Sequence, residues 1–187
     1  MKILYTLGNF EYSGLQIIFY DINAQNKSVT SYQKQIDYTF APALGPLKSM
    51  FMPMEGIDPV DPPETGDVVW TKTNGNQYIA HGILKNTPDD VYDLNALRLV
   101  MRSVRKKAIL LKQEYIAMPV IAPDDDINLW RMVYPIVEQE LYDIQPIVFV
   151  PIEERLLSVL KVIGGEINAY EHAPLEIRFT KSQNSDK

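Results

Sequence analysis

The stretch LNALRLVMRSVRKKAILLKQEYIAMPVI, residues 94–121, decides the fold. Its first part carries apolar side chains at steps of three and four, which predicts an amphipathic helix over residues 94–111. Asp93 precedes this pattern and is a suitable N-cap. Its last part, residues 115–121, is a continuous apolar run, typical of a strand buried on both faces. A helix that leads into a buried strand predicts an α/β protein.

Further strand and helix patterns lie on both sides of this stretch. They are strands at 2–7, 15–22, 67–72, 77–84 and 146–150, a weak polar helix within 26–35, and an amphipathic helix at 130–141. Asn74 and Gly75 predict a hairpin between two of the strands. Pro135 predicts a kink in the last helix or a start near Tyr134. We expect a three-layer α/β/α domain with a mixed central sheet.

The segment 41–66 has a different character. It contains prolines at positions 42, 46, 53, 59, 62 and 63. Because proline lacks an N–H and restricts its neighbour, we expect a long loop without regular helix or strand. Residues 50–54, MFMPM, would form a partner surface if exposed, or would cover the sheet if folded down.

The expected organisation is one domain at residues 1–151, which includes this loop. Residues 152–187 then form a C-terminal extension that packs on the same domain and begins with a helix-like stretch at 152–163.

Composition limits the classes of function. The chain has 187 residues, of which 46% are hydrophobic, and a formal net charge of −6. This charge argues against a nucleic-acid partner, which would need a concentrated basic face. Cysteine is absent and there are two histidines, so disulfides, thiolate catalysis and zinc sites of the Cys/His type are excluded. Apolar runs such as 147–151 are too short to cross a bilayer, and we expect a cytoplasmic protein without a membrane partner.

An ordered series of short motifs resembles the second half of a macrodomain. In chain order they are GDVVW at 66–70, YIAH at 78–81, IAMPVI at 116–121, EQEL at 138–141 and IVFV at 147–150. The first half is similar more loosely: LGN at 7–9 resembles the Gly-Asp after the family's first strand, and FYDIN at 19–23 its strand-two asparagine motif. The branch that contains the terminal ADP-ribose protein glycohydrolase is the most similar. The resemblance implies a macrodomain-like fold that binds ADP-ribose or a related nucleotide across the carboxyl ends of the central strands.

The resemblance also implies a set of ligand-binding residues. They are Asn9, Tyr20, Asn23, Ala122, Asp124 and Phe149. Asn9 stands where the family has an aspartate that accepts a hydrogen bond from the adenine amino group, and an Asn carbonyl can still accept. Phe149 stands where an aromatic ring often stacks on adenine, although an aromatic residue in an apolar strand is also a common core residue. Tyr20 replaces an asparagine that contacts the distal ribose, and its ring could fill that space.

The two phosphate loops depart from the family's pattern. The first is matched by residues 27–31, which contain no glycine. In the second, residues 122–126, Pro123 removes an N–H donor and the acidic run 124–126 would face a diphosphate. Like charges near 4 Å repel by about 1 kcal/mol in water and by several times that at lower dielectric. This loop is a poor diphosphate cradle unless a divalent cation bridges, and we expect no other metal or cofactor.

In the resembled branch a lysine attacks the ribose and an aspartate assists release. These roles fall on Lys85 and Asp126. A partly desolvated lysine with a carboxylate nearby could perform this chemistry. The simpler interpretation is that Lys85 is a solvated lysine beyond a strand and that Asp126 caps the following helix.

Three functions remain open from the sequence. The leading one is recognition of ADP-ribose or an ADP-ribosylated protein, with or without removal of the ADP-ribosyl group. The alternative is a catalytically inactive macrodomain-like fold that serves as a protein-interaction module through residues 41–66. A third is a metal-assisted phosphoesterase with Mg²⁺ on residues 124–126, although three adjacent carboxylates rarely all face one ion.

Overall fold

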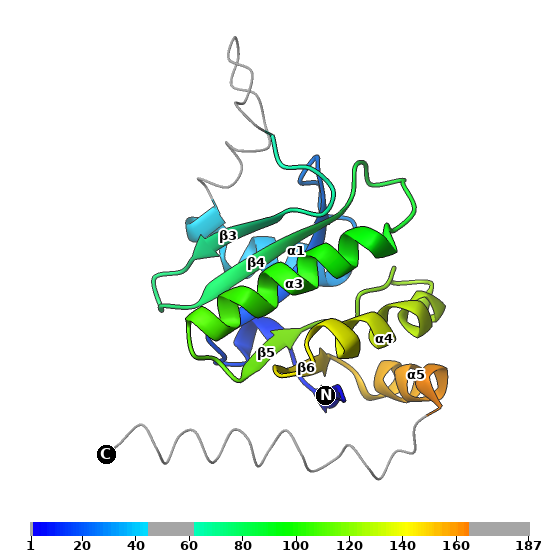
Figure 1. Ribbon diagram of the computed structural model, residues 1–187. Helices are drawn as coiled ribbons and strands as arrows, with labels where there is room; N and C mark the ends of the chain where they lie inside the picture. The colour runs from blue at the N-terminus through cyan, green and yellow to red at the C-terminus, as the bar shows by residue number, and fades with distance from the viewer. Residues whose placement is uncertain (1, 45–61, 165–187) are drawn as a thin grey trace, which may run out of the picture.

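The computed structural model describes residues 2–44 and 62–164 and shows a six-stranded sheet between two layers of helices (Figure 1). The strands are β1 (Leu4–Leu7), β2 (Ile17–Asn23), β3 (Val68–Lys72), β4 (Tyr78–Lys85), β5 (Tyr115–Met118) and β6 (Gln145–Val150). Their order across the sheet is β1-β6-β5-β2-β4-β3. All neighbouring pairs are parallel except β3 with β4, which form an antiparallel edge. The predicted mixed sheet is therefore confirmed.

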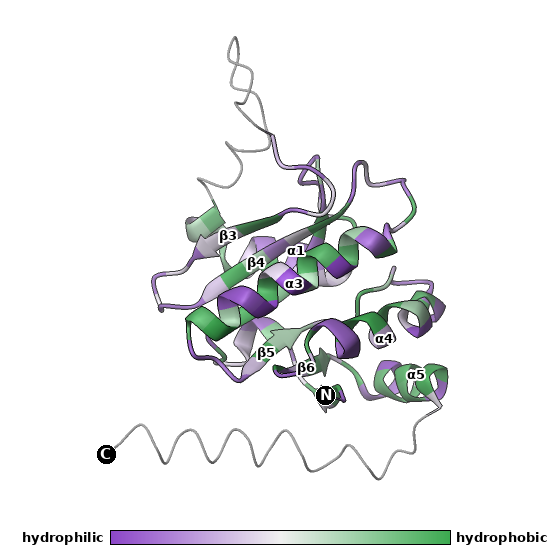
Figure 2. Ribbon diagram, viewed as in Figure 1, coloured by the Kyte–Doolittle hydropathy of each residue, from purple (hydrophilic) through white to green (hydrophobic). Residues whose placement is uncertain are grey.

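The helices divide unequally between the two faces. They are α1 (Ser31–Thr39), α3 (Leu94–Leu110), α4 (Trp130–Glu140) and α5 (Glu153–Ile163), with short 3₁₀ helices η1 (Phe10–Tyr12) and η2 (Ile127–Leu129). In Figure 1, α3, α4 and α5 lie on the near face of the sheet and α1 lies behind it. Figure 2 shows hydrophobic and hydrophilic residues alternating along α3, α4 and α5. Each of these helices therefore turns one apolar side to the sheet and leaves a polar side in water.

Each face of the sheet has its own apolar core. On the α3 side, Phe19 of β2 packs with Leu97 and Val100 of α3. On the α1 side, Ile18 of β2 packs with Ile36 of α1. Gly82 of β4 permits the close approach on the first side, because a Cβ there would lie 2.6 Å from Phe19 Cε2 and 2.7 Å from Val100 Cγ1.

Most predicted helices and strands are confirmed, together with several of the capping and turn residues predicted for them. Asp93 caps α3 by accepting hydrogen bonds from the backbone N–H groups of Asn95 and Ala96. The hairpin forms between β3 and β4, but its left-handed residue is Asn76 (φ 59°) rather than Gly75. Helix α4 begins at Trp130 and includes Pro135, so the alternative start near Tyr134 is wrong.

Three boundaries differ from the sequence prediction. The strand predicted at 115–121 ends at Met118, and the polar helix predicted within 26–35 is α1, which runs from Ser31 to Thr39. Residues 41–44 form a helical turn although a loop was predicted there, because Pro42 stands near the start of the turn, where no N–H is required. The remaining Pro-rich residues 45–61, with the MFMPM segment, lie outside the described residues, as do residues 165–187.

The first part of the C-terminal extension packs on the sheet. Helix α5 contacts α4, β1 and β6, and it buries Val159 and Leu160 in the core on the α3 side. It ends at Gly164, whose φ of 70° is a left-handed C-cap.

Candidate ligand-binding site

A cavity of about 360 Å³ lies beyond the carboxyl ends of β1, β5 and β6. Residues that follow each of these strands line it, together with residues at the beginnings of α1 and α5. Gly8 turns the chain from β1 into η1 with a φ of 134°, a conformation that favours glycine, and its N–H donates to Val150 O at 2.9 Å. This turn brings Asn9 and Glu11 to the cavity.

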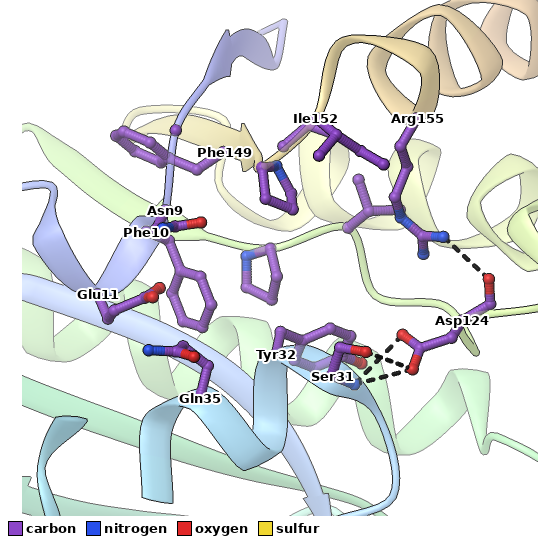
Figure 3. Close-up of a pocket in the computed structure, with 15 residues that line it drawn as sticks. Asn9, Phe10, Glu11, Ser31, Tyr32, Gln35, Asp124, Phe149, Ile152 and Arg155 are labelled. Atoms are coloured by element: carbon purple, nitrogen blue, oxygen red, sulfur yellow. Dashed lines mark hydrogen bonds between the residues drawn. The ribbon is translucent and has the colours of Figure 1, made fainter. Parts of the chain in front are cut away.

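One end of the cavity combines aromatic rings with polar side chains. Figure 3 shows Phe10 and Phe149 near Asn9, Glu11 and Gln35. Phe149 is 3% exposed and also belongs to the core on the α1 side. Such a surface offers both an apolar contact for a flat ring and acceptors or donors for its edge.

Glu11 is an unusual carboxylate in this position. It is 4% exposed, and its Oε1 has no hydrogen-bond partner among residues 2–44 and 62–164. Burial raises the pKa of Glu11, although its own backbone N–H opposes this shift. A buried polar atom without a partner costs free energy, because water no longer solvates it.

The other end of the cavity is built from helix N-termini and charged side chains. Asp124 accepts hydrogen bonds from Ser31 N at 2.9 Å and from Ser31 Oγ at 2.7 Å (Figure 3). Arg155 of α5 donates from Nη1 to Asp124 O at 3.0 Å. Ser31 is the first residue of α1, so the Asp124 carboxylate lies against the positive end of that helix.

A second cavity, of about 40 Å³, lies beyond the ends of β2 and β4. Asp21, Asn23, Lys85 and Tyr92 line it. Lys85 Nζ donates to Pro88 O at 3.2 Å and lies 4.3 Å from the centre of the Tyr92 ring. The ammonium group therefore already has a hydrogen-bond acceptor and an aromatic face.

Asp21 is the buried carboxylate of this second cavity. Tyr32 Oη donates to Asp21 Oδ1 at 2.5 Å, and Gln33 Nε2 donates to Asp21 O at 2.8 Å. Burial raises the pKa of Asp21, while Tyr32 and Tyr92 oppose the shift. These contacts join the end of β2 to α1.

A contact between the start of α1 and the segment after β5 separates the cavities. Thr30 and Pro123 line the small cavity, whereas the next residues, Ser31 and Asp124, line the large one. The hydrogen bonds between Ser31 and Asp124 therefore lie at the boundary. Lys85 is on the far side of this boundary from Phe149.

Solved structures share this architecture, although comparison of the sequence alone finds no match. No protein-family model and no curated protein matches the chain. The macrodomain of Thermus aquaticus DarG superposes with a TM-score of 0.64 at 13% identity, covering 80% of this chain and 98% of that chain. A macrodomain protein from Streptomyces coelicolor gives 0.64 at 15% identity, covering 80% and 99%. The protein has the macrodomain fold.

A third neighbour with this fold was solved with a ligand. It is Thermosipho africanus DarTG in complex with ADP-ribose, with a TM-score of 0.64 at 13% identity. The superposition covers 87% of this chain and 46% of that chain. The predicted macrodomain-like α/β/α architecture is thus confirmed, while the finer placement in the glycohydrolase branch stays a prediction.

On this macrodomain fold the predicted site residues fall into three groups. Asn9, Asp124 and Phe149 line the large cavity. Asn23 and Lys85 line the small one. Tyr20, Ala122 and Asp126 line neither of these two cavities in the described part of the chain.

Tyr20 is a core residue of the α1 side. It is fully buried, and its hydroxyl lies 2.7 Å from His81 Nδ1 on the neighbouring strand β4. His81 Nε2 lies 2.9 Å from Thr71 Oγ1, so both ring nitrogens have partners. Burial lowers the pKa of His81 to about 3. Tyr20 therefore faces the core rather than either cavity, because the alternation of β2 turns its side chain inward, and its contact with a ligand stays a prediction.

The remaining predicted residues have structural contacts of their own. Ala122 is fully buried in the core on the α3 side. Asp126 is exposed and caps η2, accepting from Asn128 N at 3.1 Å. Asn23 holds a turn, because its Oδ1 accepts from Lys27 N at 3.1 Å and its Nδ2 donates to Lys27 O at 2.7 Å.

Sequence reasoning did not single out Glu11 and Arg155 at the large cavity or Asp21 at the small one, whereas Ser31 falls in the predicted first phosphate loop. A signal existed for Asp21, since a carboxylate inside the apolar run of β2 has to find partners when buried. Glu11 and Arg155 gave no comparable local signal.

The carboxylates of residues 124–126 do not form a metal-ligand group in the described part of the chain. Within residues 2–44 and 62–164, no three His, Cys, Asp or Glu side chains gather as ligands of one ion. Asp124 faces Ser31 and Asp126 faces Asn128. A search of the same residues also finds no helix with the length and apolar character that a bilayer crossing requires.

Proposed function

We propose that this protein binds ADP-ribose or a related nucleotide in the large cavity. The cavity carries the proposal: it lies at the carboxyl ends of parallel strands, where ligands of open α/β sheets bind. Its volume of about 360 Å³ falls within the usual range for small-molecule sites. The neighbour solved in complex with ADP-ribose supports this choice of ligand class.

The two ends of the cavity suit the two ends of a nucleotide. Phe10 and Phe149 belong to the wall of the cavity, where a base would contact the edges of their largely buried rings. The guanidinium of Arg155 and the N-terminus of α1 are groups that bind phosphate in proteins. We therefore place the base beside Phe149 and the diphosphate toward Ser31.

We propose that the protein binds the nucleotide but does not hydrolyse it, because Lys85 and Asp126 are not arranged as a catalytic pair. Lys85 is engaged by Pro88 O and Tyr92, and the Ser31–Asp124 contact lies between it and the large cavity. Asp126 caps η2 instead of facing Lys85. A nucleophile and its proton-transfer partner need to approach one reacting atom, and this arrangement keeps them on different contacts.

A protein-interaction role through residues 41–66 stays a prediction. Its central residues 45–61 lie outside the described residues. The proposal of nucleotide binding depends on none of them.

The test is calorimetric titration of the full chain with ADP-ribose, together with thermal unfolding. Ligand at a hundredfold excess over its dissociation constant should add about 2.7 kcal/mol to the free energy of unfolding. Phe149→Leu keeps the side chain apolar while removing the ring, and it should weaken binding; Lys85→Ala should not. Absence of binding with ADP-ribose and with other nucleoside diphosphates at millimolar concentration would overturn the proposal.

An ADP-ribosylated peptide tests the second part of the proposal. The wild-type chain should release no ADP-ribose from it. Release that disappears in Lys85→Ala and Asp126→Ala would instead establish the hydrolytic mechanism.

A further inference from the structure

The buried carboxylate of Glu11 has an oxygen that could accept a hydrogen bond from a bound ligand. Its Oε1 has no partner in the described ranges 2–44 and 62–164, and the residue lines the large cavity at the aromatic end. Native proteins leave few buried polar atoms unpaired, and such an atom in a cavity wall is a natural place for a ligand donor. Figure 3 shows the carboxylate beside Phe10 and above Gln35.

The neighbours of Glu11 define which ligand edge would fit. Asn9 stands just before η1 and, within the described chain, makes no side-chain capping bond to it. Its amide therefore offers a donor and an acceptor at the cavity. Phe149 and Phe10 provide the apolar surface for a planar ring whose edge these polar groups would contact.

The chemistry of purine edges distinguishes two candidates. A carboxylate presents two acceptor oxygens and is best matched by two adjacent donors. Guanine presents its ring N1–H beside its exocyclic 2-amino group, and its 6-oxo group accepts a hydrogen bond from an amide donor. Adenine presents its 6-amino donor beside a ring nitrogen with a lone pair, which would oppose the second carboxylate oxygen.

We propose that the base end of the large cavity selects a guanine nucleotide over an adenine nucleotide, with Glu11 accepting from the N1–H and 2-amino groups and Asn9 donating to the 6-oxo group. This inference rests on the proposed function, because it places a base beside Phe149. The amide of Asn9 suits this pairing, since it can donate to the 6-oxo group.

Titration calorimetry of the full chain with GDP, IDP and ADP tests the selection. These diphosphates share sugar and phosphates, and IDP lacks the 2-amino group of GDP while keeping N1–H and the 6-oxo group. GDP should bind roughly tenfold or more tighter than ADP, as one good bidentate pair achieves, with IDP between them. The order GDP, IDP, ADP needs no mutation and is independent of the folding of any variant.

Glu11→Gln assigns the selection to this side chain. The substitution preserves size but replaces one acceptor with a donor, so the preference for GDP over ADP should fall by roughly tenfold. Glu154→Gln is the matched control, because Glu154 is an exposed acid in the first turn of α5, outside the cavity lining. It removes the same charge and should leave the preference unchanged.

The outcomes separate the two proposals. If ADP binds as tightly as GDP and Phe149→Leu weakens both, the base selection is overturned and nucleotide binding stands. If GDP is preferred but Glu11→Gln retains the preference, the role of Glu11 is overturned. If neither GDP, IDP, ADP nor ADP-ribose binds, nucleotide binding itself is overturned.

Discussion

Replacing Asp124 by Asn should tighten the binding of a diphosphate ligand. The Asp124 carboxylate accepts from Ser31 N at 2.9 Å and from Ser31 Oγ at 2.7 Å, so it occupies the first N–H of α1. That N–H group and the helix dipole would otherwise favour a phosphate oxygen. In the wild-type chain the Asp124 carboxylate already accepts from the N–H of Ser31, and its negative charge repels the phosphate of an approaching ligand.

The magnitude follows from Coulomb's law. Two unit charges 4 Å apart repel by about 1 kcal/mol in bulk water and by about 4 kcal/mol at the effective dielectric of a protein surface. Asp124 is exposed, so we take about 1–2 kcal/mol, which corresponds to roughly 5- to 30-fold tighter binding in Asp124→Asn. The free energy of unfolding should fall by about 0.5–1 kcal/mol, because the charge no longer stabilises the N-terminus of α1.

Titration of both proteins with ADP-ribose and with pyrophosphate at low and high salt measures this effect. Asp125→Asn is the control, since it removes the same charge from an exposed neighbour outside the cavity lining. The gain in Asp124→Asn should shrink at high salt, where exposed charges are screened. Equal gains in the two variants, or weaker binding in Asp124→Asn, would refute the reasoning.

Three further predictions concern stability. The pKa of His81 is about 3 when folded and about 6.5 when unfolded, so only the unfolded chain gains this proton between those values. Stability should therefore fall by about 2.5 kcal/mol from pH 7 to pH 4.5 through this residue. An NMR titration should show no midpoint for His81 above pH 4.5, and a midpoint near 6.5 for His81 would contradict it. Tyr20→Phe should lower the free energy of unfolding in urea by about 1–3 kcal/mol, because it leaves His81 Nδ1 unpaired, and it should not change nucleotide affinity. A loss of affinity with intact stability would instead indicate that Tyr20 contacts the ligand. Gly82→Ala should cost about 1–3 kcal/mol through overpacking, whereas Gly75→Ala, with its nearest atom at 3.8 Å, should stay within about 0.5 kcal/mol; similar losses would argue against the close contact at β4.

The fold could be predicted where local pattern and tertiary contact agree. Helix α3 combines a clear apolar period with the Asp93 cap, and both features are encoded within a few residues. Helix α1 was placed too early, although Thr30 and Gln33 form a capping box that marks its start. Its sequence is mostly polar, and Ile36 is its one buried apolar residue that packs on the sheet.

The site could be predicted only in part, because chain order shows where strands end but not which loops meet. Asn9, Asp124 and Phe149 line one cavity because parallel strands deliver their carboxyl ends to one edge of the sheet, and their contact with a ligand stays a prediction. The sequence did not reveal the core contact of Tyr20, because its partner His81 is brought beside it by the register of β2 and β4. Glu11 was missed because the absence of a partner is a property of the folded surroundings.

Two carboxylates at opposite ends of the cavity should have opposite effects on ligand affinity. Glu11 is buried with an unpaired oxygen and gains a partner when a base binds, whereas Asp124 is exposed, already paired and opposed to phosphate. Affinity should therefore reside mainly at the base end, so GDP should bind the wild-type chain less than roughly tenfold more tightly than guanosine. In Asp124→Asn this ratio should rise, because the phosphate then meets the N-terminus of α1 without a competing charge. Titrations of both ligands against both proteins give the four affinities, and a wild-type ratio above roughly a hundredfold would place the dominant contacts at the phosphate end instead.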